Sequence, residues 1–355
     1  MLRINWLNKK NINFARVNEL LESSLATNQF TNYGPVVRLL EDKIRSILKI
    51  DDSKSIIVVD NGTSAIHALI SGINMYHNKK FKFATQAFTF PSSAQGSVND
   101  SVILDIDYDI GLNINLIPDN IDGIIVTNVF GNVVDIDKYL DWSNKNNKFL
   151  ILDNAATSFT SYNGQNSCNY GTGSIISFHH TKPIGFGEGG AIIVDKIYEK
   201  EIRKCINFGI DNLAINPQHH REGSNYKMSD IAAAYIIQYL ENFDLIIKKH
   251  QALYNLFKNE LDKINGVKLL SNKSDQIPFV SCLPVLFKNE MYAKEEFFLS
   301  KKIYCRKYYK PLEKLPVSTK IYDHILCFPC HRDMTDDDIF YIIDSIKAQL
   351  EILKI

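Results

Sequence analysis

A cluster of glycine and hydroxyl residues in this 355-residue sequence has the composition of an anion-binding loop. It is the segment 61–65, Asn-Gly-Thr-Ser-Ala, which lies between an apolar run and a helical pattern. Gly62 lets a ligand approach the backbone closely, and Thr63 and Ser64 add hydroxyls. The free N–H groups of a first helical turn favour phosphate. The segment is therefore a candidate phosphate site, but by itself it is a weak signal, because Ser and Thr cap helices routinely and most such loops are structural.

A carboxylate and a lysine stand in similar positions. Asp153 ends the apolar run 149–152 and is either a helix cap or a functional acid. Lys182 lies within the glycine-rich segment 177–190, which directly follows another apolar run. A lysine in such a loop is a candidate amine nucleophile, whereas most lone lysines are solvated surface groups.

The glycines near Lys182 spell G-x-G-x-x-G at Gly185, Gly187 and Gly190. A dinucleotide fingerprint requires a strand before this pattern and a helix after it. Residues 191–194 have the composition of a strand. We therefore interpret the glycines as a tight loop that holds Lys182, and we reject a nicotinamide-linked dehydrogenase.

The other polar clusters do not predict a metal site. The segment 223–230 is typical of a turn and a helix cap. The pairs 179–180 and 219–220 are adjacent histidines, which point apart on a strand. The Cys-Phe-Pro-Cys segment 327–330, with His331 beside it, lacks the second ligand pair of a closed zinc site. We therefore expect no metal.

The elements that must position these residues alternate between strands and helices. Residues 63–76 carry an apolar stripe, and Asp135 is placed to cap a helix that extends to Trp142. This alternation indicates an α/β fold. Ligands of an open parallel sheet bind beyond the carboxyl ends of its strands, where the polar clusters fall. The β-branched runs that predict strands buried on both faces are 55–60, 102–107, 123–128, 149–153, 174–178 and 191–195.

The C-terminal third has a different pattern. Residues 228–264 are long and helical, and Thr335 with three aspartates opens a last helix. Strand-like pieces lie between them, at 279–287 and 303–309. We therefore predict a large α/β domain over 1–244 and a smaller α+β domain over 245–355.

Composition excludes several classes of protein. The sequence has 40 Lys+Arg, 40 Asp+Glu and 45% hydrophobic residues, so a basic footprint for nucleic acid is disfavoured. No apolar run approaches the roughly 18 residues of a membrane-spanning helix, and the first residues do not form a signal peptide. Six irregularly placed cysteines fit free thiols in a reducing compartment, so we expect a cytoplasmic protein.

In chain order these segments resemble the sugar-nucleotide aminotransferases of the DegT/DnrJ family, which are fold-type I pyridoxal phosphate (PLP) enzymes. The most specific match is Ser177-Phe178-x-x-x-Lys182, followed by Glu188-Gly189-Gly190. The segments Asn225-x-Lys227-Met228 and Phe130-Gly131-Asn132 add support. The resemblance implies a mostly parallel central sheet flanked by helices, with a smaller C-terminal α+β domain.

The resemblance also implies a role for each site residue. Lys182 would bond covalently to the PLP aldehyde, Asp153 would pair with the pyridine nitrogen, and Phe90 would stack on the ring. Asn225 would reach the phosphate of the neighbouring subunit's cofactor, which requires a homodimer with a shared active site. The residues that would hold the phosphate are Gly62, Thr63, Ser64 and Ser177.

One departure from the family pattern concerns the position three residues after Asp153. This position is often Gln or His in the family and is Ala156 here, so a contact to the cofactor face or its phenolic oxygen must come from elsewhere. Asn154 is also unusual in a stretch that commonly reads Asp-Ala-Ala.

The substrates implied by the resemblance are L-glutamate as amine donor and a keto sugar nucleotide as acceptor. Two half-reactions predict ping-pong kinetics. The segment 304–312 and the pair Lys227-Met228 resemble enzymes that make dTDP-4-amino-4,6-dideoxyglucose (viosamine) from a dTDP-4-keto-6-deoxy sugar. The candidate substrate residues are Asn32, Arg306, Tyr309 and His331.

Three alternatives stay open at this point. Amination at C3 of a dTDP-3-keto-6-deoxyhexose is the nearest one. A PLP-dependent dehydration is disfavoured, because such relatives typically carry His where this sequence has Lys182. A non-catalytic member that binds PLP or a sugar nucleotide is the third.

Overall fold

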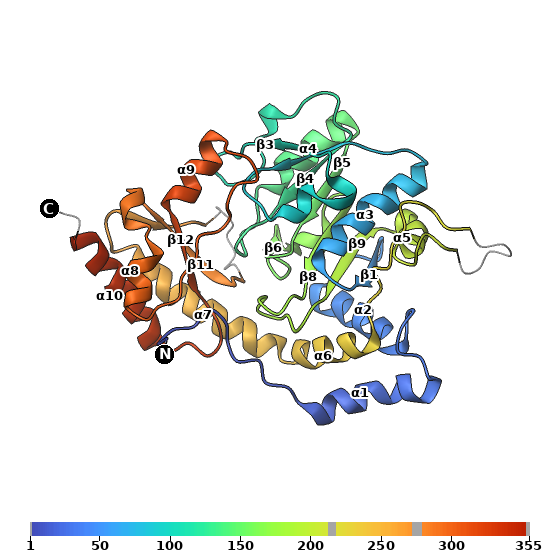
Figure 1. The fold of residues 1–355 in the computed structure, drawn as a ribbon, viewed down its shortest axis with the longest axis horizontal. Coiled ribbons are helices and arrows are strands. Elements are labelled where there is room, and N and C mark those ends of the chain that lie inside the picture. The colour runs from blue at the N-terminus through green and yellow to red at the C-terminus, as the bar shows by residue number, and fades with distance from the viewer. Residues whose placement is uncertain (1, 212–217, 272–278, 353–355) are drawn as a thin grey trace.

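A seven-stranded sheet forms the centre of the chain in the computed structural model, which describes residues 2–211, 218–271 and 279–352 (Figure 1). Its strand order is β1-β9-β8-β5-β4-β2-β3. The bounds are Lys54–Val59 for β1, Phe83–Gln86 for β2, Val102–Leu104 for β3, Gly123–Thr127 for β4, Phe149–Asp153 for β5, Gly173–Ser177 for β8 and Gly190–Asp195 for β9.

Most neighbouring strands of this sheet run parallel. The pairs β3–β2, β2–β4, β4–β5 and β5–β8 are parallel, whereas β9 is antiparallel to both β8 and β1. All residues of β4 and nearly all of β5, β8 and β9 are buried, as the continuous β-branched runs predict. The predicted α/β class with a mostly parallel sheet is confirmed.

Helices cover both faces of the sheet. Successive residues of a strand alternate between the two faces, so Ile124 packs with α4 whereas Ile125 packs with α3 and α5. The helix bounds are Phe14–Thr27 for α1, Pro35–Leu48 for α2, Gly62–His77 for α3, Ile136–Asn146 for α4, Glu199–Cys205 for α5 and Asp230–Leu240 for α6.

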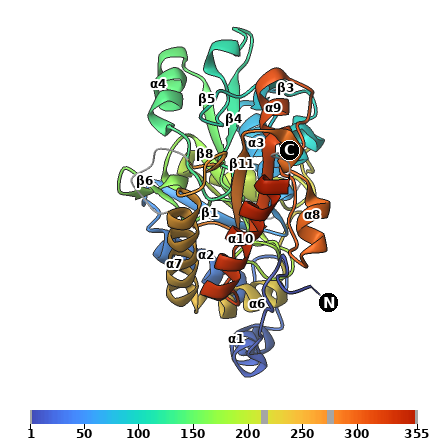
Figure 2. The ribbon, with the colours of Figure 1, turned by 90° about the vertical axis from the view of Figure 1, so that its left-hand side faces the viewer.

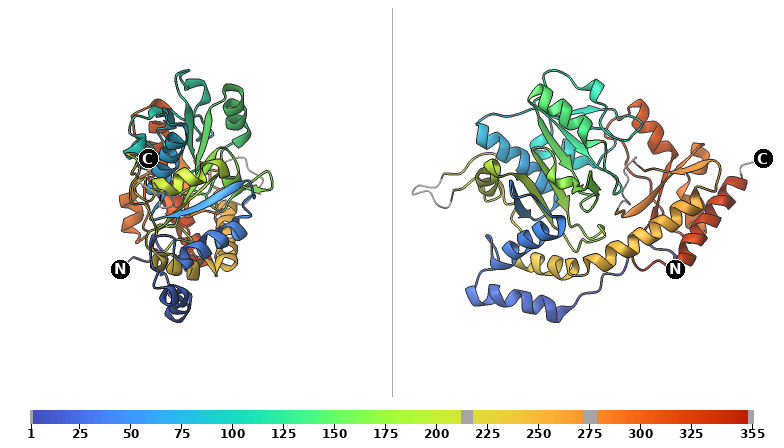
Figure 3. Two further views of the ribbon diagram at one scale, coloured as in Figure 1. Left: turned by 90° about the vertical axis from the view of Figure 1, so that its right-hand side faces the viewer. Right: turned by 180° about the vertical axis from the view of Figure 1, so that it is seen from behind.

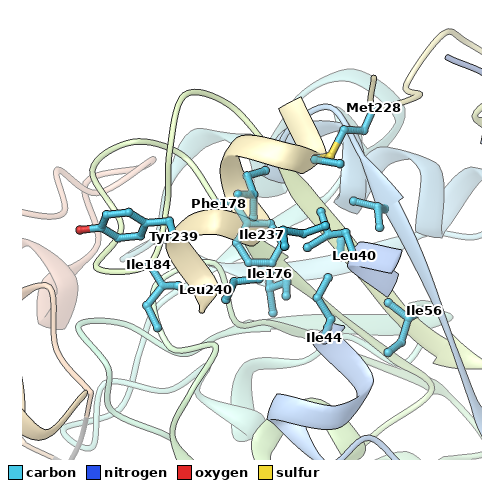
Figure 4. Close-up of a cluster of buried hydrophobic side chains, with 14 of the residues drawn as sticks. Leu40, Ile44, Ile56, Ile176, Phe178, Ile184, Met228, Ile237, Tyr239 and Leu240 are labelled. Atoms are coloured by element: carbon cyan, nitrogen blue, oxygen red, sulfur yellow. The ribbon is translucent and has the colours of Figure 1, made fainter. Parts of the chain in front are cut away.

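The helices α2 and α6 close one part of the core. Leu40 and Ile44 of α2 meet Ile237 and Leu240 of α6 over the strand residue Ile176 (Figure 4). Burial of each such side chain stabilises the fold by about 1.5–3 kcal/mol relative to exposure. This packing fixes the sheet from which the site is built.

A three-stranded antiparallel sheet, β10-β11-β12, organises the C-terminal part. The helix α7 continues from α6 toward this sheet and lies beside α10 (Figures 2 and 3). The bounds are Phe243–Leu261 for α7, Val267–Leu269 for β10, Cys282–Phe287 for β11, Glu295–Ser300 for α8, Pro316–His324 for α9, Ile325–Pro329 for β12 and Asp336–Ile352 for α10. A short hairpin, β6 (Ser161–Tyr162) and β7 (Gln165–Asn166), completes the strands of the described chain.

The N-terminal residues join the C-terminal part. Ile4 is buried in the same hydrophobic cluster as residues 253–350 and forms an isolated bridge with Ile303. The predicted division of the chain at residue 244 stays a prediction.

Several local expectations differ from the structure. Asp135 is the N-cap residue of α4, but its side chain accepts a hydrogen bond from the Tyr162 hydroxyl (2.8 Å) instead of capping the helix. The segment 303–309 forms only isolated bridges, at Ile303 and Arg306. The helical segment 228–264 is two helices, and the strand β2 was not among those predicted.

Thr335 caps α10 as predicted. The Thr335 hydroxyl accepts a hydrogen bond from the backbone N–H of Asp338 (3.3 Å), and the Asp338 carboxylate accepts one from the Thr335 N–H (2.9 Å). Among the helices in the described ranges, none is long and apolar enough to cross a membrane.

Candidate active site

A cavity of about 700 Å³ opens at the carboxyl ends of β4, β5 and β8. Thr127, Asp153 and Ser177 are the last residues of those three strands, and each lines the cavity. Lys182 projects from the loop that follows β8 and lines it as well. The polar clusters therefore meet where a parallel sheet is expected to bind its ligand.

Asp153 is a buried carboxylate with spare hydrogen-bonding capacity. Its Oδ1 accepts a hydrogen bond from the Ala155 N–H (3.0 Å), and the Thr127 hydroxyl lies 3.5 Å from Oδ2. Burial raises the pKa of Asp153, and these contacts and the charge of Lys182 oppose the rise. Within the described residues Asp153 has no ion pair, so it can receive a cationic N–H from a ligand.

Lys182 is held by a tight turn of its own loop. Its N–H donates to the His179 carbonyl (2.8 Å), and its carbonyl accepts from the Gly185 N–H (3.0 Å). Burial lowers the pKa of Lys182, whereas Asp153 and Cys282 raise it. A lower pKa leaves more of the amine neutral at pH 7, which is the nucleophilic form.

The N-terminus of α3 forms the opposite wall. Asn61 caps this helix by accepting a hydrogen bond from the Ser64 N–H (2.8 Å), and Ala65 donates the first helical hydrogen bond, to the Asn61 carbonyl. A Cβ added to Gly62 would lie 3.1 Å from the Ser177 Cβ, so glycine permits the close approach of the two segments. The helix end, Thr63, Ser64 and Ser177 line one corner of the cavity, and the N-terminus of a helix favours an anion.

Phe90 precedes a short 3-10 turn, Pro91–Ala94, and lines the cavity with a side chain that is 57% exposed. An exposed aromatic ring beside a cavity is available to stack on a planar ligand.

Residues 304–309, here called the tyrosine segment, belong to the C-terminal part, and Arg306, Tyr308 and Tyr309 of this segment line the cavity. The Arg306 guanidinium donates to the hydroxyls of Tyr308 (2.9 Å) and Tyr304 (2.8 Å), and it lies over the Trp6 ring at 5.7 Å. In the described chain no carboxylate pairs with Arg306. Its positive charge is therefore available to a phosphate or carboxylate of the substrate.

Tyr309 lies deeper in the cavity. Its ring stacks on that of Phe130 with centroids 5.3 Å apart, and burial raises the pKa of its hydroxyl well above the usual range. A neutral hydroxyl that faces the cavity can donate or accept a hydrogen bond.

Three predicted site residues lie outside the cavity of this chain. Asn32 is exposed, with its backbone in the left-handed region (φ 54°). Asn225 is exposed and pairs with Asn207 through an isolated bridge. His331 is buried against the N-terminal segment, where its Nε2 lies 3.0 Å from the Asn5 carbonyl. The fold thus brings together the other predicted residues and not these three.

Several cavity residues were not singled out from the sequence. Trp6 and Cys282 come from segments far from the motifs, so only the tertiary fold places them. His67 follows Thr63 by one helical turn, a spacing that places it on the same face. Its Nε2 is buried and has no hydrogen-bond partner in the described structure.

Three polar side chains accompany Lys182 on its own loop. His179 Nδ1 lies 2.8 Å from the Thr181 hydroxyl, and its Nε2 lies 3.5 Å from the Glu188 carboxylate. All three residues line the cavity. All three belong to the glycine-rich segment 177–190 that contains Lys182, so the sequence pattern that pointed to Lys182 could also have pointed to them.

Ala156 also lines the cavity, where it presents a methyl group. Cys327 lies within β12, and all six cysteines are free and buried. Among the described residues, no three His, Cys, Asp or Glu side chains gather as metal ligands. The absence of a metal stays a prediction.

Comparison with known proteins identifies the class to which this fold and cavity belong. The profile of the DegT/DnrJ/EryC1/StrS aminotransferase family matches residues 12–347. The chain therefore belongs to this family. It is a PLP-dependent sugar aminotransferase, and the predicted family resemblance, enzyme class and cofactor are confirmed.

Individual relatives cover nearly the whole chain. The dTDP-4-amino-4,6-dideoxy-D-glucose transaminase of Shigella dysenteriae is 27% identical over 354 residues, which cover 92% of this chain and 94% of that protein. The UDP-4-amino-4,6-dideoxy-N-acetyl-beta-L-altrosamine transaminase of Campylobacter jejuni is 29% identical over 66% of this chain and 68% of its own length. The Helicobacter pylori aminotransferase PseC, involved in the biosynthesis of pseudoaminic acid, has a TM-score of 0.86 at 16% identity and 99% coverage of both chains.

The cavity suits PLP chemically. A buried carboxylate with spare capacity suits a protonated pyridine nitrogen, and the capped end of α3 suits a phosphate. The amine of Lys182 lies in the same cavity and has a lowered pKa. These three features complement the three functional ends of the cofactor.

Proposed function

We propose that this protein transfers the amino group of L-glutamate to C4 of dTDP-4-keto-6-deoxy-D-glucose, yielding dTDP-4-amino-4,6-dideoxy-D-glucose. The observation that carries the chemistry is that Lys182 and Asp153 line one cavity at the carboxyl ends of the parallel strands. The similarity to the Shigella transaminase over nearly the full length supports the substrate.

Under this proposal the predicted site residues that line the cavity have distinct tasks. Asp153 holds a proton at the pyridine nitrogen, and Gly62, Thr63, Ser64 and Ser177 hold the phosphate. Phe90 packs on one face of the ring. PLP, when bound, supplies a carbonyl that takes up amines and a ring that withdraws electrons from the substrate carbon.

Lys182 acts as the covalent anchor and then as the acid–base group. When PLP is bound, the neutral Nζ of Lys182 would hold its carbonyl covalently, and the freed amine would take up the proton of the substrate carbon. Burial suits both tasks, because it lowers the pKa of the Lys182 amine against the opposing charge of Asp153.

The tyrosine segment binds the acceptor. Arg306 offers a charge to the diphosphate of the sugar nucleotide, and Tyr309 faces the sugar. We keep Asn32 and His331 as weaker candidates, which would need a partner subunit or a movement to reach the substrate. A UDP-linked acceptor is the alternative supported by the Campylobacter relative.

We further propose a homodimer, in which Asn225 reaches the phosphate site of the partner subunit. This assignment fits the exposure of Asn225 outside its own cavity. The cytoplasmic location expected from the six free cysteines belongs to the same proposal. We expect neither nucleic acid nor a membrane as partner.

The test is transfer from ¹⁵N-labelled glutamate to dTDP- and UDP-linked keto sugars, with products analysed by mass spectrometry and NMR. Wild-type protein should place the label at C4 of the dTDP sugar, and Lys182→Ala should abolish both the transfer and the visible band of bound PLP. Lys9→Ala, at an exposed lysine, is the control. Full activity of Lys182→Ala would refute the proposal.

Label at C3 would identify the 3-aminotransferase instead. Binding of PLP and sugar nucleotide without any label transfer would identify a non-catalytic member of the family.

A further inference from the structure

The N-terminal segment, residues 4–10, connects the C-terminal part of the molecule with the catalytic-lysine loop. At its start, Ile4 bridges to Ile303. Further along, the Lys9 N–H donates to the Asp333 carboxylate (2.7 Å), and the Asn8 side-chain amide donates to the Tyr239 hydroxyl (3.1 Å). The segment is therefore held in place at Ile4, Asn8 and Lys9.

Lys10 ends this segment and reaches the turn that carries Lys182. Its Nζ donates to the backbone carbonyl of Lys182 (2.7 Å) and to that of Gly185. The two carbonyls belong to the same tight turn, since the Gly185 N–H also bonds to the Lys182 carbonyl. One side chain thus ties both ends of the turn to a segment more than 170 residues away in sequence.

Within the described residues, these two carbonyls are the hydrogen-bond acceptors of the Lys10 amine. It has no carboxylate partner among the described residues, and its Nζ lies 4.6 Å from the centre of the Tyr239 ring. Burial and the nearby charge of Arg332 lower the pKa of Lys10 to about 7. A buried amine without an anionic partner is costly, so a role that repays this cost is expected.

We propose that Lys10 is a positioning residue for Lys182, acting through the backbone of the catalytic-lysine turn. The amine of Lys182 lies at the end of a flexible side chain, so the position of Nζ depends on where the backbone holds the Cα. Bonds from Lys10 to the carbonyls of Lys182 and Gly185 fix that backbone from outside the sheet. Misplacement of a reacting group by about 1 Å can cost on the order of 10²-fold in rate.

The inference rests on the proposed role of Lys182, and the variants are Lys10→Met, Lys10→Arg and Lys10→Gln. Methionine keeps the length and removes the donors, whereas arginine keeps the donors. Lys9→Met is the matched control, because Lys9 is exposed and uses only its backbone in these contacts. The readouts on PLP-loaded protein are the pH titration of the visible cofactor band and the separate kcat and KM values.

Lys10→Met should shift the midpoint of the band titration by about half a pH unit or more. It should lower kcat roughly tenfold or more with KM values within about twofold of wild type. Lys10→Arg should recover most of both effects, and Lys9→Met should match wild type. A titration and a kcat for Lys10→Met that equal those of wild type would overturn the inference.

If Lys10→Met does not fold, the comparison of Lys10→Arg with Lys10→Gln decides. A wild-type band titration in the arginine variant and an altered one in the glutamine variant support the inference, whereas equal titrations overturn it. Absence of a visible band in wild-type protein would instead refute the proposed role of Lys182.

Discussion

At the scale of single residues, the two groups required for the chemistry are both buried in ways that disfavour their charges. Burial raises the pKa of Asp153 and lowers that of Lys182, and the attraction between the two groups opposes both shifts. Such opposed shifts in one cavity are typical of functional sites, because a purely structural site gains nothing from them.

Replacement of Asp153 by Asn should lower the transfer activity without lowering the stability of the fold. The amide keeps the shape of the carboxylate and an oxygen for the Ala155 N–H, but it no longer stabilises a proton on the ring. We expect transfer to fall by on the order of 10²-fold or more. The melting temperature of cofactor-free protein should stay level or rise, because no charge is buried.

Calorimetry and label transfer on the same preparations measure the two effects. Asp119→Asn, at an exposed aspartate, is the control and should leave both unchanged. Transfer within about twofold of wild type in Asp153→Asn would contradict the assignment of the ring-nitrogen partner.

At the scale of elements, one aspartate joins the large sheet to the C-terminal helices. Asp105 follows β3, and its carboxylate accepts hydrogen bonds from the N–H groups of Val317 (2.8 Å) and Ser318 (2.9 Å) in the first turn of α9. Ile321 of α9 packs in the same cluster as Phe130, beside the tyrosine segment. The position of α9 is therefore coupled to the wall of the cavity.

Asp105→Ala should lower the free energy of unfolding by about 2 kcal/mol, the upper end for loss of a helix cap. Asp105→Asn, which keeps one acceptor, should lose roughly half as much. Urea denaturation followed by tryptophan fluorescence measures both values. Asp119→Ala, at an exposed site, is the reference, and equal stability of Asp105→Ala and Asp119→Ala would show that this cap is dispensable.

At the scale of the whole molecule, the two sheets meet along a seam that contains a buried histidine. His250 of α7 lies with Nδ1 2.9 Å from the Val280 carbonyl, and burial lowers its pKa from 6.5 to about 4. Its neighbour Phe279 packs with the large-sheet core, whereas Val280 packs with the C-terminal core. The positive charges of His331, Lys10 and Arg332 lower the pKa of His250 further.

This histidine should make the protein sensitive to acid. Between pH 6.5 and about 4 the unfolded chain binds a proton at His250 that the folded chain does not, so stability falls as the pH falls. The loss relative to His250→Gln should reach about 3 kcal/mol. Chemical denaturation of both proteins at pH 7.5 and pH 4 measures it, and parallel losses would show that His250 does not titrate as expected.

The proposed homodimer predicts complementation between two impaired chains. Lys182→Ala and Asn225→Ala should each have little activity alone. In a mixed dimer, one of the two sites combines an intact Lys182 with an intact Asn225 from the other chain. Mixed dimers isolated through two affinity tags should therefore have roughly half of the wild-type activity.

Coexpression with two affinity tags provides the mixed dimers, and label transfer measures their activity. Asn225→Ala with wild-type activity, or mixed dimers that are no more active than the two variants, would exclude an active site shared through Asn225.

The sequence by itself determined the elements and residues whose signals are local. The buried strands follow from runs such as 123–128. Lys182 and Asp153 were candidates from their places after apolar runs, the family resemblance implied their roles, and the structure places both in one cavity. The start of α3 at Gly62 was also predictable from the adjacent residues 61–65 alone. A single stretch of chain carries all the information that these elements need.

Only the tertiary structure decided which distant segments complete the cavity. Trp6, Cys282 and Lys10 carry no local pattern, and the fold brings them to the site by packing the N-terminal segment between the two parts of the molecule. Long-range packing likewise kept 303–309 out of a regular strand and moved His331 away from the cavity. Contacts between residues hundreds of positions apart depend on the shapes of all the intervening elements, which no local pattern encodes.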